Sequence, residues 1–303
     1  MDHNQIESQN ILTTFFEDIR EFIKEQVKNV NLNQKSIDFI NTTKLESLLR
    51  QFIYFRKRYP IGKYKVYIPQ SICMSAKYAK YKNQVLHIKT LLEMGEDIGD
   101  YLHKGITDFL FYDNLLEDWG IIHIHLQPKG KRNKDDNDLL YAIQIGDSIL
   151  FLKVDTHGCF LQKELLEILY KNVPKFAGFF PISGNCLTET EIKSLRKKGY
   201  GYVLDLGEKS FYGGLNRILS YAGDVQILKN LRNLSTLICS NFQQIKSALE
   251  QAGYRGNIDL HLIISAREKK IKLLEANSRT EIRFSGNDIL DKLTNCFLNL
   301  HFF

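Results

Sequence analysis

The middle of the chain decides the fold, and there residues 139–154 read LLYAIQIGDSILFLKV. Two mostly apolar runs flank the dipeptide Gly146-Asp147. Glycine at the first of two loop residues is typical of the type II′ turn that joins antiparallel strands. We therefore expect a β-hairpin with strands over residues 139–145 and 148–154.

A leading strand is expected before the hairpin, where residues 120–126 read GIIHIHL. Side chains alternate between the two faces of a strand, so His123 and His125 share one face. With a two-residue loop, the hairpin register pairs Tyr141 with Leu152 on an apolar face. The side chains expected on the opposite face are Lys153, Asp155 and His157. If the leading strand joins this sheet with its apolar face on the same side, three histidines converge on one surface.

Such a cluster suits RNA cleavage by general acid–base catalysis. Imidazole titrates near neutral pH, so a histidine can take the proton of a ribose 2′-hydroxyl and return one to the leaving oxygen. Basic side chains of the following loop can bind the phosphate and offset the charge that builds on it. The candidate catalytic residues are His123, His125, His157, Lys153 and Arg132, with Lys129 and Lys131 as phosphate contacts.

Two other interpretations of these residues stay open. In the first, the cluster binds a metal ion, because imidazole and carboxylate are workable ligands for zinc or manganese. The ligands would be His123, His125, Asp155 and His157. In the second, the histidines are half-buried strand residues with backbone partners, and their role is structural.

The charge of the chain is distributed unevenly around a net value of +6. The segment from Ser47 to Leu92 contains no Asp or Glu, ten Lys or Arg residues and eight aromatic residues. Basic groups neutralise phosphates and aromatic faces stack on unpaired bases, so this composition is typical of a nucleic-acid surface. The residues expected to contact nucleic acid are Arg56, Lys57, Arg58, Lys63, Lys65, Lys129 and Lys131. The alternative is that the tyrosines pack in the core and the lysines are only solvated.

The remaining patterns predict an α+β fold, with a helical N-terminal region, a small antiparallel sheet in the middle and an α+β C-terminal half. Apolar periodicity predicts helices over residues 11–27, 43–58, 83–102, 161–170, 190–198 and 225–252. Further strands are expected over residues 65–68, 202–206, 258–264 and 271–274. We expect a helical lead-in with a nuclease sheet in residues 1–158, and an accessory or sensing domain in residues 159–303.

The segment from Trp119 to His157 resembles the barnase/RelE-type ribonuclease toxins. It follows a helical lead-in and combines a strand, a basic loop and a tight hairpin that ends in candidate catalytic side chains. The resemblance is architectural. It implies that a small antiparallel sheet carries the RNA-cleaving residues and that basic or histidine side chains transfer the protons. It also implies an antitoxin or inhibitor protein as a partner.

Composition argues against several classes of protein. The chain is 44% hydrophobic and 12% aromatic, which argues against disorder, and no apolar run approaches the ~20 residues of a membrane helix. The polar start, MDHN, predicts no secretory signal. Five distant Cys without a C-x-x-C pair predict reduced thiols in the cytoplasm. The chain has no P-loop, dinucleotide fingerprint or G-x-S-x-G motif, so we expect no cofactor.

These features together favour a cytoplasmic endoribonuclease, a hydrolase of the toxin or antiviral-defence kind that binds RNA or another nucleic acid and no membrane. The alternatives are a metal-dependent hydrolase that uses the same His/Asp cluster and a non-enzymatic, nucleic-acid-binding regulatory protein. Metal analysis separates the two enzymes. Activity assays on RNA and DNA separate both enzymes from the regulatory protein.

Overall fold

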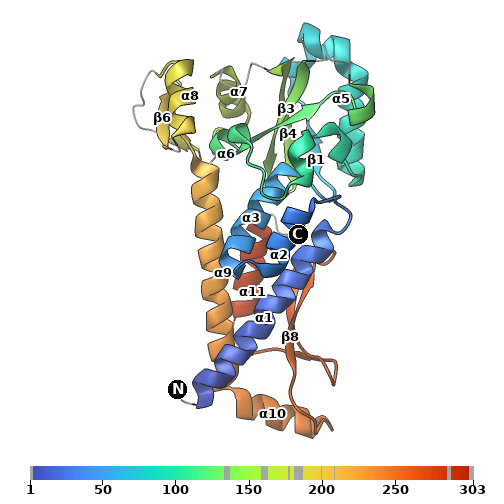
Figure 1. The fold of residues 1–303 in the computed structure, drawn as a ribbon, viewed down its shortest axis with the longest axis vertical. Coiled ribbons are helices and arrows are strands. Elements are labelled where there is room, and N and C mark those ends of the chain that lie inside the picture. The colour runs from blue at the N-terminus through green and yellow to red at the C-terminus, as the bar shows by residue number, and fades with distance from the viewer. Residues whose placement is uncertain are drawn as a thin grey trace. The chain divides into compact units, whose positions relative to one another are not determined.

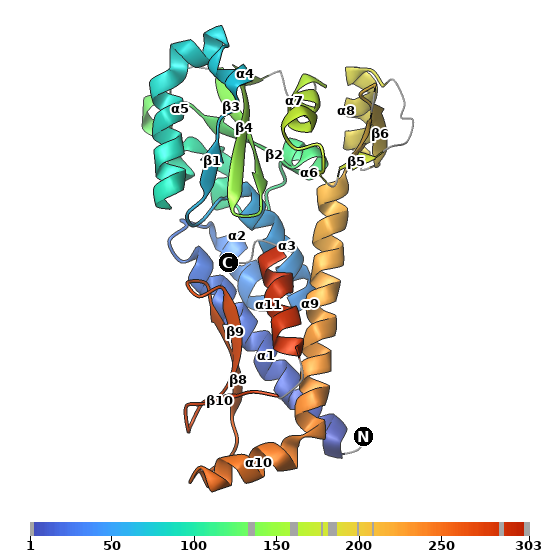
Figure 2. The same cartoon turned by 180° about the vertical axis from the view of Figure 1, so that it is seen from behind.

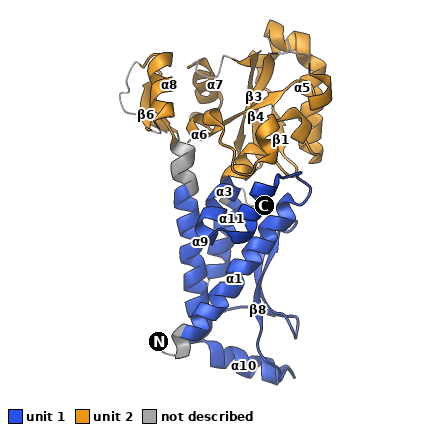
Figure 3. Ribbon diagram, viewed as in Figure 1, with its two compact units in different colours: residues 1–53, 220–303 blue, residues 54–219 orange. Residues whose placement is uncertain are grey.

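The structure is a computed structural model that describes residues 3–132, 137–157, 163–176, 178–180, 187–198, 200–207, 209–284 and 288–299. The chain forms two compact units (Figure 3). Residues 1–53 and 220–303 form the first, here named the split unit, and residues 54–219 form the continuous unit. Helices and small sheets occur in both, so the α+β class expected from the sequence is confirmed.

The expected division after residue 158 does not coincide with these units. The split unit joins the first helices to the last part of the chain, and its boundaries lie at residues 53 and 219. Both boundaries fall within helices, where linker composition gives no signal. Residues 158–162, where we expected the division, lie outside the described part of the chain.

The main sheet of the continuous unit has the order β1-β4-β3-β2 (Figures 1 and 2). Its strands are β1 (Lys65–Tyr67), β2 (Ile121–His125), β3 (Asp138–Ile145) and β4 (Ser148–Thr156). β2, β3 and β4 are antiparallel, as expected, and β1 joins β4 in parallel. The hairpin turn lies at Gly146, whose φ of 58° is the left-handed conformation that the first loop residue of a type II′ turn requires.

A β-bulge in β4 changes the register that the sequence predicted. Ala142 pairs with Phe151, but the next residue, Tyr141, pairs with Lys153, so Leu152 is the extra residue. The predicted pair of Tyr141 with Leu152 is therefore wrong. One extra residue reverses the alternation of side chains, so Tyr141 shares a face with Lys153.

Both faces of this sheet are covered over most of their length. On the face of Tyr141, the core contains Trp119 from α6, Leu165 from α7 and Phe211 from a second sheet, ordered β5-β7-β6. On the opposite face, Ile124 and Phe151 are buried as well. The covering elements on the Tyr141 face are α6 (Asn114–Trp119), α7 (Glu164–Asn172), α8 (Glu189–Lys197), β5 (Phe179–Phe180), β6 (Tyr202–Asp205) and β7 (Ser210–Gly213). The sheet therefore has no broad face open to solvent.

The helix expected over residues 83–102 begins and ends earlier. It is α5 (Ala76–Met94), which starts at the side-chain cap of Ser75 and ends at Gly95. Gly95 has a φ of 77°, and this left-handed conformation terminates the helix. Besides α5 and α6, the described residues between α3 (Leu45–Arg58) and β3 form α4 (Gln70–Cys73) and the 3₁₀ turns η1 (Gly99–Tyr101), η2 (Lys104–Thr107) and η3 (Lys129–Lys131).

The split unit combines helices with a three-stranded sheet of order β10-β9-β8. α1 packs along β8, and α11 packs along β9. Besides α3, its elements are α1 (His3–Val27), α2 (Gln34–Thr42), α9 (Leu215–Ser240), α10 (Phe242–Gln251), β8 (Leu260–Ser265), β9 (Lys270–Glu275), β10 (Thr280–Ile282) and α11 (Ile289–Asn299). The strands expected over residues 258–264 and 271–274 correspond to β8 and β9, which pair in antiparallel fashion. The prediction of a single helix over residues 225–252 is wrong, because the helix is interrupted at Asn241, between α9 and α10.

Two further findings bear on the class of protein. Within the described ranges, no helix is both long and apolar enough to cross a membrane. Cys73, Cys239 and Cys296 carry free thiols. The other two cysteines, Cys159 and Cys186, lie outside the described residues.

Replacement of Gly95 by Ala should destabilise the protein by about 1–2 kcal/mol, the cost of a left-handed conformation in a residue with a Cβ atom. The new Cβ would also lie 2.9 Å from Lys63 Cγ. Gly130→Ala is the matched control, because a Cβ there meets nothing within 4 Å. Urea unfolding measures both variants, and equal stabilities would contradict the assignment of Gly95 as an obligatory helix stop.

Candidate active site

Four of the eight histidines gather at one end of the main sheet. The ring of His123, on β2, lies 6.2 Å from that of His125 and 5.8 Å from that of His157, which follows β4. The ring of His103 also lies 6.2 Å from that of His123. The structure thus brings together the three histidines singled out from the sequence and adds a fourth.

His103 was missed because it lies in an irregular segment, where no strand or helix period assigns a face. It precedes η2, and its Nδ1 accepts a hydrogen bond of 2.9 Å from the backbone N–H of Gly105. Its ring stacks on Phe111, with centroids 5.0 Å apart. The only sequence signal was its residue type.

Asp113 orients the central imidazole. Its Oδ1 accepts hydrogen bonds from the backbone N–H groups of Leu115 and Leu116, which fixes it as the N-cap of α6. Its Oδ2 lies 3.2 Å from Nδ1 of His123. A carboxylate accepts hydrogen bonds, so Nδ1 of neutral His123 carries the hydrogen and Nε2 carries the free lone pair. This pairing is the usual way to prepare a histidine as a base.

The Nε2 atom of His123 is buried and has no hydrogen-bond partner among the described residues. Leaving a buried polar atom unpaired costs about 1–3 kcal/mol. Such atoms are rare in folded proteins, and each calls for an explanation such as strain, chemistry or a missing ligand. The Nε2 atom of His123 lies at the centre of the histidine cluster, next to the rings of His103, His125 and His157.

Burial keeps most of the cluster neutral. It lowers the pKa of His123, and the Asp113 carboxylate opposes that shift only in part. It also lowers the pKa of His103, with a smaller contribution from the neighbouring imidazole of His123. Burial, followed by the charge of Arg132, lowers the pKa of His125 to about 3. At neutral pH these three side chains are therefore proton acceptors.

Arg132 lies close enough to act on this cluster electrostatically, but its guanidinium is anchored. Nε donates to the carbonyl of Gln127 at 3.0 Å, and Nη2 donates to the carbonyls of Leu102, at 3.0 Å, and Asp100. These bonds hold the basic loop against the η1 region. Arg132 therefore supplies a fixed positive charge beside His123 and His125.

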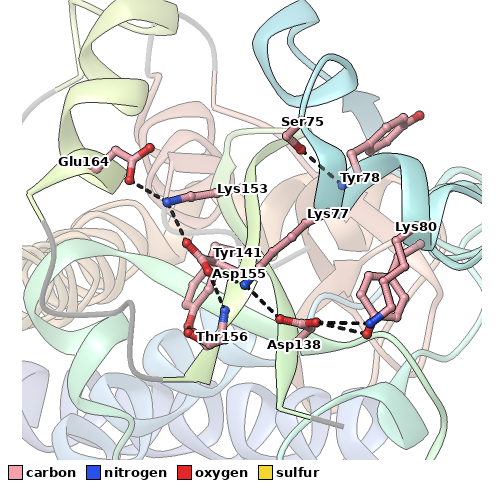
Figure 4. Close-up of polar contacts among 11 residues, drawn as sticks. Ser75, Lys77, Tyr78, Lys80, Asp138, Tyr141, Lys153, Asp155, Thr156 and Glu164 are labelled. Carbon is pink, nitrogen blue, oxygen red and sulfur yellow. Dashed lines mark hydrogen bonds and ion pairs between the residues drawn. The ribbon is translucent and has the colours of Figure 1, made fainter.

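Lys153 and Asp155 belong to a separate chain of ion pairs (Figure 4). The Lys153 ammonium lies 2.6 Å from Asp155 Oδ2 and 2.5 Å from Glu164 Oε2. Lys77, on α5, lies 2.6 Å from Asp155 and 3.0 Å from Asp138. These ion pairs connect α5 and α7 to the ends of β3 and β4. Lys153 and Asp155 therefore have structural partners, and the catalytic role expected for Lys153 stays a prediction.

The predicted metal ligands do not form a shared site. Asp155 faces two lysines, and within the ranges that the structure describes no three His, Cys, Asp or Glu side chains are arranged to hold a metal ion.

The basic surface expected from residues 47–92 is wrong in its central part, because Arg56 and Arg58 are buried. Nη2 of Arg58 donates to the carbonyl of Asp108 at 2.8 Å, and Nη1 donates to that of Phe111. Burial also lowers the pKa of Lys57 to about 8. The aromatic residues that are buried in this segment are Phe52, Tyr54, Phe55, Tyr59, Tyr64, Tyr78 and Tyr81. An acid-free segment can therefore be a core whose arginines bind carbonyls.

The other basic residues expected to contact nucleic acid are accessible. Lys63, Lys65 and Lys131 are exposed, and Lys129 is half-buried. Lys129 and Lys131 are in η3, next to Arg132 and hence to the histidine cluster. Only these two lie on the same short segment as a residue of the candidate site.

In comparisons with known proteins, the chain matches no protein family, no curated protein and no solved structure. The resemblance to ribonuclease toxins therefore stays a prediction, and the function must be argued from the site itself.

Arg58→Ala should destabilise the protein by about 2–4 kcal/mol, because it removes the hydrogen bonds that Arg58 donates to the carbonyls of Asp108 and Phe111 and the packing of the guanidinium between Phe55 and Phe111. Lys65→Ala, at an exposed position, should change stability by less than about 0.5 kcal/mol. Chemical denaturation measures both. An equally small loss of stability in both variants would indicate that Arg58 is a surface residue, as the sequence predicted.

Asp155→Asn should destabilise the protein at pH 7 by about 1–2 kcal/mol, a value reduced for solvent because Lys77 is 38% exposed. Although burial opposes ionisation, bonds to Lys153 and Lys77 hold the pKa of Asp155 below its ordinary value. The ion pairs therefore stabilise above the unfolded pKa of about 3.9 and lose this effect as pH falls through the lower folded pKa.

The difference between wild type and Asp155→Asn should accordingly shrink below about pH 4 in urea unfolding series. Glu25→Gln is the control, because it breaks a pair with Lys28 in which both side chains are exposed, and it should have little effect at any pH. A destabilisation by Asp155→Asn that does not vary with pH would show that packing, and not charge, is the cause.

Proposed function

We propose that the continuous unit cleaves RNA by histidine general acid–base catalysis, without a metal ion. The observation that carries the proposal is the gathering of three imidazoles around His123, whose Nδ1 faces Asp113 and whose Nε2 is unpaired among the described atoms. Buried polar atoms of folded proteins usually have a partner, so this unpaired nitrogen among further imidazoles calls for an explanation. A base held by a carboxylate beside further imidazoles suits proton transfer.

In the proposed reaction, His123 is the base. Its Nε2 takes the proton of a ribose 2′-hydroxyl, and the 2′-oxygen forms a bond to the adjacent phosphorus. The bond from phosphorus to the 5′-oxygen breaks, and a protonated His157 gives that oxygen its proton. The products are a 2′,3′-cyclic phosphate and a free 5′-hydroxyl, so the reaction consumes no water at this step.

Accessibility supports this division of roles. His157 is exposed, so an RNA strand can reach it from solvent. The Nε2 atom of His123 is covered in this structure, and RNA must displace its neighbours to reach it. Catalytic hydrogen bonds often form only when substrate is bound. The exposed imidazole therefore meets the leaving group, and the inner imidazole is reached on binding.

His125 and Arg132 act on the phosphate in this scheme. With a pKa of about 3, His125 stays neutral at pH 7 and cannot serve as a cationic acid. Its neutral ring can still donate a hydrogen bond to a phosphate oxygen. Arg132 offsets the negative charge that builds on the phosphate, and Lys129 and Lys131 draw the RNA backbone to η3.

The toxin or host-defence setting is part of the proposal and rests on the resemblance of residues 119–157. Such an enzyme, present without its inhibitor, degrades the RNA of its own cell. Induced expression should then stop growth, and the histidine variants described next should relieve the arrest.

His123→Ala and His157→Ala should each reduce cleavage of a labelled RNA oligonucleotide by roughly 10²- to 10⁴-fold, the usual cost of removing a general acid or base. RNA blocked at the 2′-oxygen by methylation should not be cleaved. His87→Ala is the control, because His87 is an exposed histidine on α5 in the same unit. If both variants fold and remain fully active, or if EDTA alone abolishes activity, this mechanism is wrong.

The pH profile of kcat/KM gives an independent measurement. The pKa of His123 is lowered, so the base stays neutral to below the ordinary histidine value of about 6.5, and the acidic limb should lie below that pH. The Asp113 charge raises this pKa, so Asp113→Asn should shift the acidic limb to still lower pH and reduce the rate. An acidic limb above pH 6.5, or a shift upward in Asp113→Asn, would exclude His123 as the base.

A further inference from the structure

A second polar cluster of the continuous unit lies where α6 meets α8. Asp118 and Arg196 form an ion pair there, and the Arg196 side chain is only 6% exposed. The guanidinium carbon lies 4.6 Å from the ring centre of Trp119. The Tyr202 hydroxyl accepts a bond of 2.9 Å from Trp119 Nε1 and lies 3.3 Å from Arg196 Nε. The side chains of Asp118, Trp119 and Tyr202 thus fix the guanidinium in one position.

The cluster leaves one donor unused. Nη2 of Arg196 is buried and has no hydrogen-bond partner in the part of the chain that the structure describes. Burial also raises the pKa of Asp118 to about 6, although the Arg196 charge opposes that shift. Burial of this ion pair therefore costs desolvation free energy, and packing alone does not offset that cost.

A cavity of about 490 Å³ adjoins this cluster. Its size is within the range of roughly 300–1,000 Å³ that is usual for small-molecule sites. Its walls include Arg196, Lys197, Lys198, Glu117, Tyr200 and Tyr212. Glycine at residue 201 leaves room for the Tyr212 side chain, because a Cβ there would lie 2.5 Å from the Tyr212 hydroxyl. The aromatic wall therefore depends on a glycine.

The charge of the walls selects an anion. Asp118 is already paired with Arg196, so Lys197 and Lys198 outweigh Glu117. The aromatic side chains favour a ligand that also has a flat ring, because Tyr200 is 61% exposed and a base can stack on it. Inorganic phosphate would use only the lysines, and a neutral ring would use only the tyrosines.

We propose that this cavity binds a nucleotide, with its phosphate at Lys197 and Lys198 and its base against Tyr200 and Tyr212. The nucleotide can be free in solution or part of an RNA strand, and both have the same chemistry. The proposal does not depend on cleavage at His123, because none of the four histidines lines this cavity.

Trp119 is the only tryptophan of the chain, and it contacts Arg196, so its fluorescence reports binding. The full chain would be titrated with adenosine and uridine 5′-monophosphates, adenosine, and inorganic phosphate, with calorimetry as a second readout. Both monophosphates should bind at least tenfold more tightly than adenosine or phosphate. The proposal is overturned if no monophosphate binds, or if phosphate alone binds as tightly.

Variants separate the two halves of the ligand. Lys197→Ala with Lys198→Ala should weaken monophosphate binding at least tenfold and leave adenosine binding unchanged, whereas Tyr200→Ala should weaken both. Lys193→Ala is the control, because Lys193 is an exposed lysine of α8 outside the cavity wall. Equal affinities in wild type and the double lysine variant would overturn the proposal.

A short 2′-O-methylated oligoribonucleotide, which histidine-catalysed cleavage cannot consume, identifies the source of the nucleotide. Tighter binding than the monophosphate, with the same dependence on Tyr200, assigns the cavity to RNA. Weaker binding assigns it to a free nucleotide. Either result supports the nucleotide chemistry, and His123→Ala should bind as wild type does even if the RNA-cleavage proposal fails.

Discussion

One extra residue in β4 sets the chemistry of the main sheet. With Leu152 as a bulge, Lys153 pairs with Tyr141 and Asp155 with Leu139, and these partners pair in turn with His123 and His125. Without the bulge, the continued register would place Leu152 and Val154 in these rows. The bulge thus turns an apolar strand end into one with charges on the histidine face, where Lys77 meets Asp155.

Burial then decides which polar groups are structural and which are available. Asp155 is matched by two lysines, and Arg58 is stacked between Phe55 and Phe111 while it binds backbone carbonyls. An unpaired nitrogen does not by itself define a site, since Arg58 Nε also lacks a partner among the described residues. At His123, the unpaired atom has further imidazoles next to it. At Arg196, the unpaired atom adjoins a cavity lined by lysines and tyrosines. Those additional groups make chemistry or binding the better explanation.

Local patterns in the sequence were enough to predict the strands of the main sheet and the hairpin turn at Gly146, because alternation and turn chemistry act over a few residues. They could not predict the bulge at Leu152, which depends on pairing across the sheet. Nor could they predict that the acid-free segment is largely core, since arginine burial depends on carbonyls supplied by Asp108 and Phe111, some fifty residues away. The convergence of the three histidines was predicted, but through a Tyr141–Leu152 pairing that the structure does not have. His103 and Asp113 could not be assigned to the site from the sequence, because the period of a strand or helix does not fix side-chain direction in irregular segments.

The spacing of the imidazoles bears directly on the proposed proton transfer. Two positive charges 5.8 Å apart repel by about 3 kcal/mol at an effective dielectric constant of 20. When His123 takes the proton of the 2′-hydroxyl, its new charge therefore favours release of a proton from His157. Uptake at one ring drives donation at the other, as the reaction needs. A single buried histidine with Asp113 would have the base but no coupled acid, and an exposed pair in water would lose most of this coupling to solvent. The half-buried cluster at the end of the sheet retains it.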